Sequence, residues 1–327
     1  MAVAVRTTEK KNKQKNVNSA SDEKTRMQKF RFGFRYSWQL YVLLLPAFIW
    51  LVIFMYGPMY GLVIAFKDYR ATDGIIGSAW AGFKYFEQFF STNIAMQTIS
   101  NTLILSIAQL VISFPIPIIF ALLINQLNGK KYRKFVQTVS YAPYFVSAVV
   151  IVSIMQVILA PGTGFVNKLL QSLGSDPIMF MSRPEWFRPL YIGSTVWQMM
   201  GFNAIIYIAA LAGISPDYYE AAIVDGASKF KRIIYIDLPL IAPTVIIMFI
   251  LAVGQIMTVG YEKAYLMQAG SNLTTGEIIS TYVYKSGLLN AQYSFATAVG
   301  LFNSVVNFIL LATTNFISKR ASNISLF

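Results

Sequence analysis

Six long apolar segments constrain this chain more than any other feature of its sequence. None of them contains an Asp, Glu, Lys or Arg, and each exceeds the roughly 20 residues that a helix needs to cross a hydrocarbon core of about 30 Å. An open strand would leave backbone groups unpaired in lipid, so helices are the expected form. The segments cover residues 40–66, 99–123, 137–159, 189–212, 240–261 and 292–318. The sequence therefore predicts an all-α integral membrane protein with six transmembrane helices.

The composition excludes several kinds of chemistry. Only 13% of the 327 residues are charged, and the chain has no His and no Cys, whereas about 25% of residues are charged in an average soluble domain. Without these two residue types, disulfides, thiol catalysis, Ser-His-Asp catalysis and the usual metal ligands are excluded. We expect no catalytic residue, no metal site and no cofactor bound by this chain.

The basic residues predict the orientation of the chain in the membrane. With the N-terminus in the cytoplasm, 19 Lys and Arg residues fall on the cytoplasmic side and 8 on the outer side. Cytoplasmic loops are enriched in Lys and Arg, so this arrangement is preferred and both termini are expected in the cytoplasm. The net charge of +13 then reflects topology, and no nucleic-acid partner is expected.

Three regions are expected along the chain. Residues 1–38 read as a basic cytoplasmic tail that ends in an interfacial aromatic segment, and no apolar stretch near Met1 suggests a cleaved signal peptide. Residues 39–320 form the six-helix domain, and residues 321–327 form a cytoplasmic C-terminal tail.

The apolar segments offer no group for ion-coupled transport. Proton- and sodium-coupled carriers usually place ionisable residues within their spans. The chain also lacks an ATP-binding Walker A loop, because its only Gly-Lys pair, Gly129-Lys130, is followed by Lys131. Uphill transport would therefore need energy from a partner chain. Uncharged polar residues within the spans suit a neutral, hydroxyl-rich solute, or they bond between helices: Asn101, Gln109, Thr195, Gln198, Asn203, Gln255, Thr258, Asn303 and Asn307.

The loop at residues 213–239 carries the most informative pattern. Ser215 followed by Pro216 is a helix-start signal, and Gly226 can break that helix and begin another. The second helix is expected to end at Leu238-Pro239. We predict a short helix, a bend and a further helix that lie under the membrane.

Glu220-Ala221-Ala222, Asp225-Gly226-Ala227 and Leu238-Pro239 have a spacing that resembles the EAA loop of permease subunits in binding-protein-dependent ABC importers. The resemblance implies the type I ABC importer permease fold in a bacterial cytoplasmic membrane. It also implies that four loop residues contact the ATPase: Glu220, Ala221, Asp225 and Gly226. The implied partners are two cytoplasmic ABC ATPase subunits that hold ATP and Mg²⁺, a second permease subunit in a heterodimer, and an extracytoplasmic solute-binding protein.

Four further segments, at residues 56–69, 259–267, 277–284 and 293–303, are similar to the polysaccharide-type sugar permeases, a subgroup that includes alginate importers. This similarity implies an oligosaccharide as the transported molecule. In maltose-type permeases the substrate site lies on the fourth, fifth and neighbouring spans. Alignment with them from Glu220 implies the following substrate-pathway residues: Thr195, Trp197, Gln198, Met199, Gln255 and Thr258. The spans supply no cation for an acidic sugar, so recognition of an anion would rest mainly with the binding protein. Lys263 and Lys285, at the outer mouth, are expected as solvated surface charges, with assistance to the entry of an anion as the alternative.

Two alternatives stay open at this point. A permease of the same machinery could carry an amino acid, glycerol phosphate or an oxyanion, and it would share the EAA loop. An intramembrane transferase would need acids near the membrane surface, for which Glu262 is a single candidate.

Overall fold

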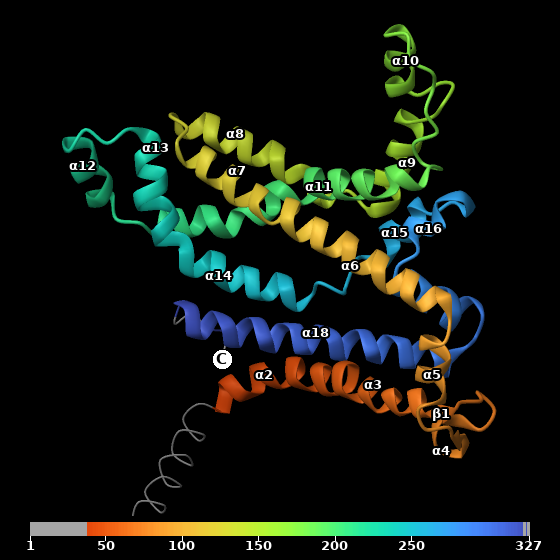
Figure 1. Ribbon diagram of the computed structural model, residues 1–327. Helices are drawn as coiled ribbons and strands as arrows, with labels where there is room; N and C mark the ends of the chain where they lie inside the picture. The colour runs from red at the N-terminus through yellow and green to blue at the C-terminus, as the bar shows by residue number, and fades with distance from the viewer. Residues whose placement is uncertain (1–37, 323–324, 326–327) are drawn as a thin grey trace, which may run out of the picture. The chain divides into compact units, whose positions relative to one another are not determined.

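Helices make up nearly all of the secondary structure in the computed structural model, which describes residues 38–322 and 325 (Figure 1). The chain divides into two compact units, residues 1–62 and 63–327. The described part of the first unit is the apolar helix α2 (Trp38–Leu51), the π-helical turn η1 (Val52–Tyr56) and α3 (Gly57–Met59). In η1 the Gly57 N–H donates to the Val52 carbonyl, five residues back. This wider turn directly precedes Pro58, which has no N–H of its own to donate.

Five long helical elements build the second unit: α6 (Asn93–Ser113), α7 (Pro115–Asn125), α11 (Pro184–Ala212), α14 (Leu238–Gly254) and α18 (Tyr293–Ser322). In Figure 1, α11 packs between α7, α6 and α14, and α14 packs against α18. Buried apolar residues fall into three clusters. The first joins α6, α9 (Ala148–Ile158) and α11 to the segment after α14, and the second joins α7, α11 and α14. The third joins α5 (Lys84–Phe90), α6, α17 (Ile279–Tyr284) and α18.

The predicted number of spans is confirmed. Within the described residues, five helices are long and apolar enough to cross a membrane, and a bent pair makes six if it counts as one span. The five helices are Trp38–Phe66, Asn93–Asn125, Pro184–Ala212, Lys229–Gly254 and Tyr293–Ala321. The main differences from the predicted bounds are described below.

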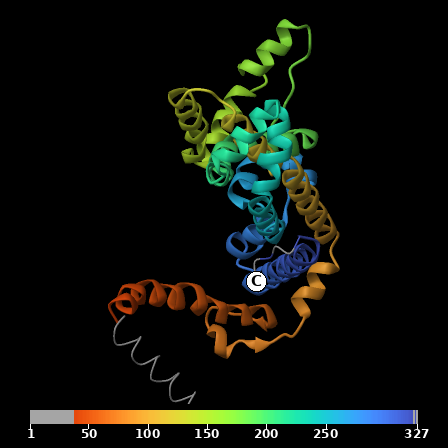
Figure 2. The ribbon, with the colours of Figure 1, turned by 90° about the vertical axis from the view of Figure 1, so that its left-hand side faces the viewer.

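Shorter elements connect the long helices. A two-residue antiparallel pair joins β1 to β2 with Lys67 opposite Trp80. The helix α10 stands away from the long helices in both ribbon views (Figures 1 and 2). The remaining short elements are η2 (Tyr60–Phe66), β1 (Lys67–Asp68), α4 (Gly74–Gly77), β2 (Ala79–Trp80), α5 (Lys84–Phe90), α10 (Phe165–Ser172), α12 (Pro216–Val224), α13 (Lys229–Arg232), η4 (Ile233–Asp237), α15 (Tyr261–Met267), η5 (Gly270–Asn272), α16 (Leu273–Gly276), α17 (Ile279–Tyr284) and η6 (Lys285–Leu289).

The third predicted span, 137–159, is wrong as a single straight helix. The structure has α8 (Lys130–Tyr141), a 3₁₀ turn η3 (Ala142–Phe145) and α9 (Ala148–Ile158), and the chain bends by 96° between them. Pro143 removes a backbone donor inside the predicted helix. The Ser147 side chain then accepts from the Val150 N–H and starts α9 as an N-cap.

Contacts with α11 stabilise this bend. The Gln198 amide donates to the Val146 carbonyl at 2.9 Å, which satisfies an acceptor that the break leaves free. The Tyr144 ring stacks on Phe202 with 3.6 Å between ring centroids. Gly201 allows the two backbones to approach, since a Cβ there would lie 2.1 Å from the Ser140 carbonyl oxygen.

The fourth and fifth spans also differ from their predicted bounds. The helix expected at 189–212 begins at Pro184, which brings Glu185 and Arg188 into it. The helix expected to reach residue 261 ends at Gly254, and residues 255–260 are turns and coil. The Gln255 and Ile256 N–H groups bond three residues back, to the carbonyls of Ala252 and Val253, so the α-helical pattern stops there.

The second helix of the loop at 213–239 was expected to end at Leu238-Pro239. In the structure it continues through η4 into α14. In η4 the Leu238 N–H donates to the Ile233 carbonyl, five residues back. As before Pro58, a π-helical turn accommodates a proline, here Pro239, without ending the helix.

The tails lie largely beyond the described part of the chain. Of the basic segment expected over residues 1–38, only Trp38 is described, and α18 extends to Ser322 through the first two residues of the expected C-terminal tail.

Candidate functional site

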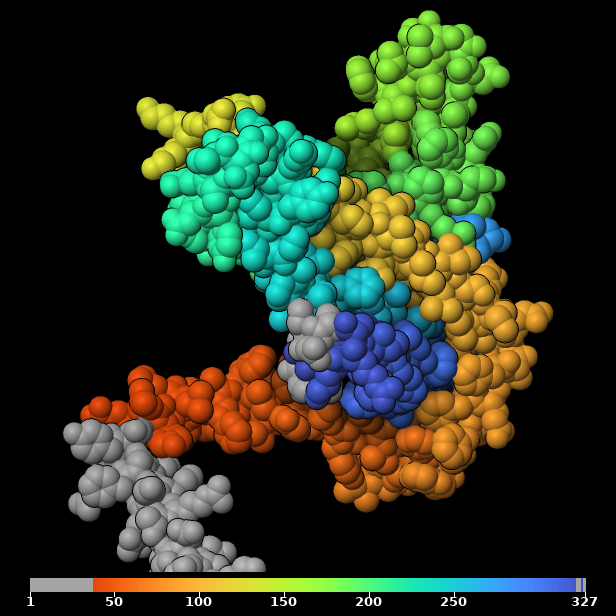
Figure 3. All heavy atoms as spheres, turned by 60° about the vertical axis from the view of Figure 1, so that its left-hand side comes forward, coloured from red at the N-terminus to blue at the C-terminus, as the bar shows by residue number. Residues whose placement is uncertain are grey.

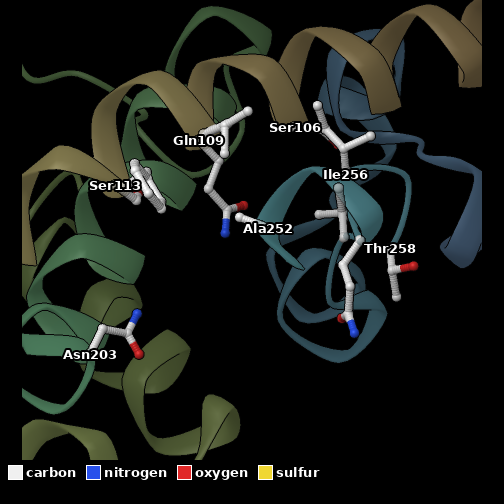
Figure 4. Close-up of a pocket in the computed structure, with 11 residues that line it drawn as sticks. Ser106, Gln109, Ser113, Asn203, Ala252, Ile256 and Thr258 are labelled. Atoms are coloured by element: carbon white, nitrogen blue, oxygen red, sulfur yellow. The ribbon is translucent and has the colours of Figure 1, made fainter. Parts of the chain in front are cut away.

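A cavity of about 380 Å³, lined by both polar and apolar side chains, lies among the long helices of the second unit. Its walls come from α6, α11, the end of α14 and the non-helical segment that follows α14. Figure 4 shows the Gln109 side chain extending from α6 toward Ala252, with Asn203 and Thr258 on the two flanks. The lining residues are Ser106, Gln109, Leu110, Ser113, Phe114, Asn203, Ala252, Gln255, Ile256, Thr258 and Val259. None of them is ionisable, so the cavity can offer amide and hydroxyl groups but no charge.

The polar wall on α6 follows from helical spacing. Ser106, Gln109 and Ser113 are three and four residues apart, which places them on one face of the helix. The Ser106 and Ser113 hydroxyls are buried and have no hydrogen-bond partner within the described chain. Both serines belong to the cavity lining, and a buried hydroxyl without a partner is unfavourable.

The opposite wall is held by α18. The Asn307 Oδ1 accepts from the Met257 N–H at 2.9 Å, and the Asn307 amide donates to the Thr258 hydroxyl at 2.9 Å. These bonds fix the segment after Gly254, where an ended helix leaves backbone groups to be satisfied by side chains. Gln255 and Thr258 are both exposed and line the cavity.

The predicted substrate-pathway residues fall into two groups. Gln255 and Thr258 line the cavity, whereas Thr195, Trp197, Gln198 and Met199 do not. Gln198 is buried and holds the bend of the third span, and Trp197 is 53% exposed. Met199 is half-buried on the same helix.

Thr195 forms a contact that the sequence did not suggest. Its hydroxyl accepts from the Lys263 ammonium at 2.9 Å and donates to the Tyr191 carbonyl at 2.7 Å. Lys263 is only 7% exposed, and burial lowers the pKa of its amine to about 8. The expectation of a solvated Lys263 is therefore wrong, because the segment after α14 folds back against α11 instead of forming an open loop.

Lys285 is not a free surface charge either. Its ammonium pairs with Glu277 at 2.7 Å, with side-chain exposures of 26% and 13%. The Thr281 hydroxyl donates to the other Glu277 oxygen at 2.8 Å. This pair ties α17 to η6 within the segment between α14 and α18.

The predicted coupling residues share an exposed segment at the opposite end of unit 2 from α15 and α16 (Figure 1). In the space-filling view, residues 213–239 protrude from the unit (Figure 3). The Ser215 side chain accepts from the Asp217 N–H, as expected for an N-cap. Gly226 has φ +72°, and the Ala227 N–H donates to the Ala222 carbonyl at 2.8 Å. Glycine is favoured here because the left-handed conformation penalises a side chain.

A buried carboxylate connects this segment to two long helices. Asp237 is fully buried, accepts from the Tyr219 hydroxyl on α12, and accepts from the Gln126 amide after α7 at 3.1 Å. Desolvation and the hydrogen bond to Asp237 raise the pKa of Tyr219 to about 12, so the phenol keeps its proton at neutral pH. Asp237 itself sits at the start of α14. We name Tyr219, Gln126 and Asp237 the Asp237 cluster.

Sequence reasoning missed several functional candidates. The serines at 106 and 113 could have been found from their helical spacing with Gln109. Asp237 directly precedes Leu238-Pro239, but nothing in the sequence indicates that its two partners lie 18 and 111 residues away.

The chain is similar to a known protein family and to several known proteins. Residues 113–323 match a protein family described as the binding-protein-dependent transport system inner membrane component. Protein LplB of Bacillus subtilis is 42% identical over 288 residues, covering 88% of this chain and 91% of the relative. The polygalacturonan/rhamnogalacturonan transport system permease protein YteP of the same species is 41% identical over 281 residues, covering 86% and 88%.

A solved structure agrees in fold. A chain in the crystal structure of a bacterial alginate ABC transporter, in complex with an alginate pentasaccharide-bound periplasmic protein, superposes with a TM-score of 0.83 at 40% identity. The match covers 90% of this chain and 98% of that one.

Proposed function

Because the chain belongs to the binding-protein-dependent transport system inner membrane components, we propose that it is the permease subunit through which an ABC importer carries an oligosaccharide across the bacterial cytoplasmic membrane. The observation that carries this proposal is the cavity of about 380 Å³, whose uncharged lining combines hydroxyl and amide side chains with apolar ones. Sugar hydroxyls both donate and accept hydrogen bonds, as these side chains do. Gln255 and Thr258, expected on the substrate pathway, lie on its wall.

Relatives support an oligosaccharide derived from an acidic polysaccharide. One relative is a permease for polygalacturonan and rhamnogalacturonan, and the superposed chain comes from an importer of alginate. All three polymers carry carboxylates. The same relatives favour a sugar over an amino acid, glycerol phosphate or an oxyanion, and transport over group transfer by an enzyme centred on Glu262.

The exposed segment at 213–239 supports coupling to a separate ATPase. Glu220, Ala221, Asp225 and Gly226 are all exposed, and α12 also exposes Ile223 at 57% and Val224 at 87%. Exposed apolar side chains on a protruding helix are suited to a protein partner. In the proposed complex, two ATPase subunits hydrolyse ATP with Mg²⁺, a second permease subunit completes the pathway, and an extracytoplasmic protein delivers the cargo.

Reconstitution of the complete importer tests this function. The experiment measures ATP-dependent uptake and stimulation of ATP hydrolysis across a panel of neutral oligosaccharides, uronate oligosaccharides, amino acids and glycerol phosphate. We expect uptake of at least one uronate oligosaccharide and none of the non-sugar solutes. Uptake of a non-sugar solute alone, or group transfer by the isolated chain, would contradict the proposal.

A further inference from the structure

Lys263 is a buried cation whose contacts are all neutral. Its ammonium donates to the Thr195 hydroxyl at 2.9 Å and lies 5.2 Å from the centroid of the Tyr191 ring. The residue is 7% exposed, and no carboxylate within residues 38–322 lies within 4.0 Å of it. An ammonium group has three donors, so two of them have no protein acceptor here.

Arg188 is a second cation, and it lies on the face of α11 that carries Tyr191 and Thr195. Residues 188, 191 and 195 are three and four positions apart, so Arg188 lies on the helical stripe that contacts Lys263. The Arg188 guanidinium donates to the Asn101 Oδ1 at 2.9 Å, while its Nε atom is buried without a partner. Asn101 is held by the carbonyls of Thr274 and Glu277, so this guanidinium also meets only neutral acceptors.

Neighbouring acids do not neutralise these two cations. Glu277 is paired with Lys285, and Glu185 and Glu262 are exposed. Removing an unpaired charge from water costs several kcal/mol, so buried charges in proteins are normally paired. Arg188 lies on α11, which is long and apolar enough to cross a membrane, and charged side chains inside membrane helices generally mark the path of a substrate or ion. The buried Lys263 and the half-buried Arg188, both without an acid among the described residues, therefore suggest an anionic partner from outside this part of the chain.

The position of the two cations relates them to the cavity. On α11, Arg188 precedes the cavity residue Asn203 by fifteen positions, about 22 Å along the helix axis, and Thr195, which binds Lys263, precedes it by eight positions, about 12 Å. Lys263 follows the cavity residues Thr258 and Val259 by only five and four positions. The helix α11 and the segment after α14 both line the cavity and also carry the two cations. The cations lie farther than the cavity from the loop at 213–239.

We propose that Lys263 and Arg188 form a carboxylate-binding subsite that recognises the uronate groups of the cargo before it enters the uncharged cavity. This inference rests on the proposed function and adds the residues that select an acidic over a neutral oligosaccharide. A uronate carboxylate can accept from either cation, and charge-assisted hydrogen bonds are about twice as strong as neutral ones.

The test uses the complete importer in proteoliposomes with saturating, loaded binding protein. Uptake is measured for a uronate oligosaccharide and for the same oligosaccharide with its carboxylates reduced to alcohols, after the affinity of the binding protein for each has been determined. In Lys263→Met, uronate uptake is expected to fall by about tenfold relative to reduced-sugar uptake, as expected for the loss of one charged hydrogen bond. Lys263→Arg should retain most of the discrimination. Arg188→Gln should shift it in the same direction as Lys263→Met.

Lys168→Met is the matched control, because it removes one positive charge from an exposed position on α10. It should discriminate between the two sugars as the wild type does. Equal loss of uptake of both sugars in Lys263→Met, or dissociation of the permease pair, would overturn the subsite and assign Lys263 to structure or to a partner's carboxylate. Unchanged discrimination would overturn it as well. If the wild-type importer takes up neither sugar, the proposed function fails instead.

Discussion

At residue 201 the absence of a side chain decides how closely α11 meets the bent third span. A Cβ at this position would lie 2.1 Å from the Ser140 carbonyl oxygen and 2.5 Å from its carbon, and both are backbone atoms. Backbone cannot move aside as the end of a flexible side chain can. Gly201 therefore permits the stacking of Tyr144 on Phe202 and the hydrogen bond from Gln198 to Val146.

Gly201→Ala should lower the stability of the assembled complex by about 1–3 kcal/mol through overpacking. Thermal denaturation in detergent measures the effect. Gly193→Ala on the same helix is the control, because a Cβ there meets nothing within 4 Å and alanine is the better helix former. Equal melting temperatures for the two variants would show that α11 and α8 do not approach as closely as the structure indicates.

The two glutamines expected on the substrate pathway should behave differently. Gln255→Leu changes an exposed residue on the cavity wall, so it should raise the KM of uptake with little change in stability. Gln198→Leu removes the donor to the Val146 carbonyl and should cost about 1–3 kcal/mol of stability. Uptake kinetics and thermal denaturation of both variants check this. The opposite pattern would place Gln198, not Gln255, on the pathway.

Among the elements, α12 is linked to the long helices through a buried carboxylate, and Tyr219 of α12 also forms a side-chain hydrogen bond with Asn125 at the end of α7. The Asp237 cluster connects α12, the end of α7 and the start of α14, so a movement of α12 changes the surroundings of both long helices. Such a hydrogen-bond network between rigid helices can carry energetic coupling between distant sites. The Asp237 cluster is therefore our candidate for the connection between the proposed ATPase contact and the cavity walls.

Tyr219→Phe leaves one oxygen of the buried Asp237 carboxylate without its donor. The ratio of cargo imported to ATP hydrolysed should fall by roughly two- to thirtyfold, which corresponds to a coupling energy of about 0.5–2 kcal/mol. Transport and ATP hydrolysis are measured in the same proteoliposomes.

Tyr235→Phe provides the control for this change, since it removes a hydroxyl from a residue of the same loop that is 75% exposed. Its ratio should match that of the wild type. If Tyr219→Phe also keeps the wild-type ratio while the complex remains assembled, the Asp237 cluster does not transmit the movement.

For the whole molecule, the excess of Lys and Arg on one side predicts the orientation in the membrane. The native chain has no cysteine, so a single introduced thiol reports its own position. A membrane-impermeant thiol reagent should label Lys229→Cys, in the loop at 213–239, only from the cytoplasmic side. Ser175→Cys, between α10 and α11, should be labelled only from outside. Both positions are exposed. Labelling of both from one side would contradict the predicted topology.

The class of the fold and the approximate positions of its spans were accessible from the sequence because they depend on local properties. A run of apolar residues is read one segment at a time, and lipid requires each such segment to be helical. The helix start at Ser215 and the bend at Gly226 are likewise local, since an N-cap and a left-handed residue involve only near neighbours.

The interior of the site could not be read in this way. Gln255 lines the cavity because α14 ends just before it. The segment after α14 is held by Asn307 on α18, about fifty residues later in the chain. The bend at Pro143 is stabilised by α11, and the segment expected as a loop at 262–291 buries Ile278 and Ile279 against α6, α11 and α18.

The sequence by itself determined the membrane class, the helical spans and the loop that resembles a coupling loop. Only the tertiary structure decided which polar groups share a cavity and which charges are buried. Lys263 shows the reason. Its charge is visible in the sequence, but its environment is made by Tyr191 and Thr195, about seventy residues earlier on another helix. Burial and pairing depend on such distant contacts, whereas helix formation in a membrane does not.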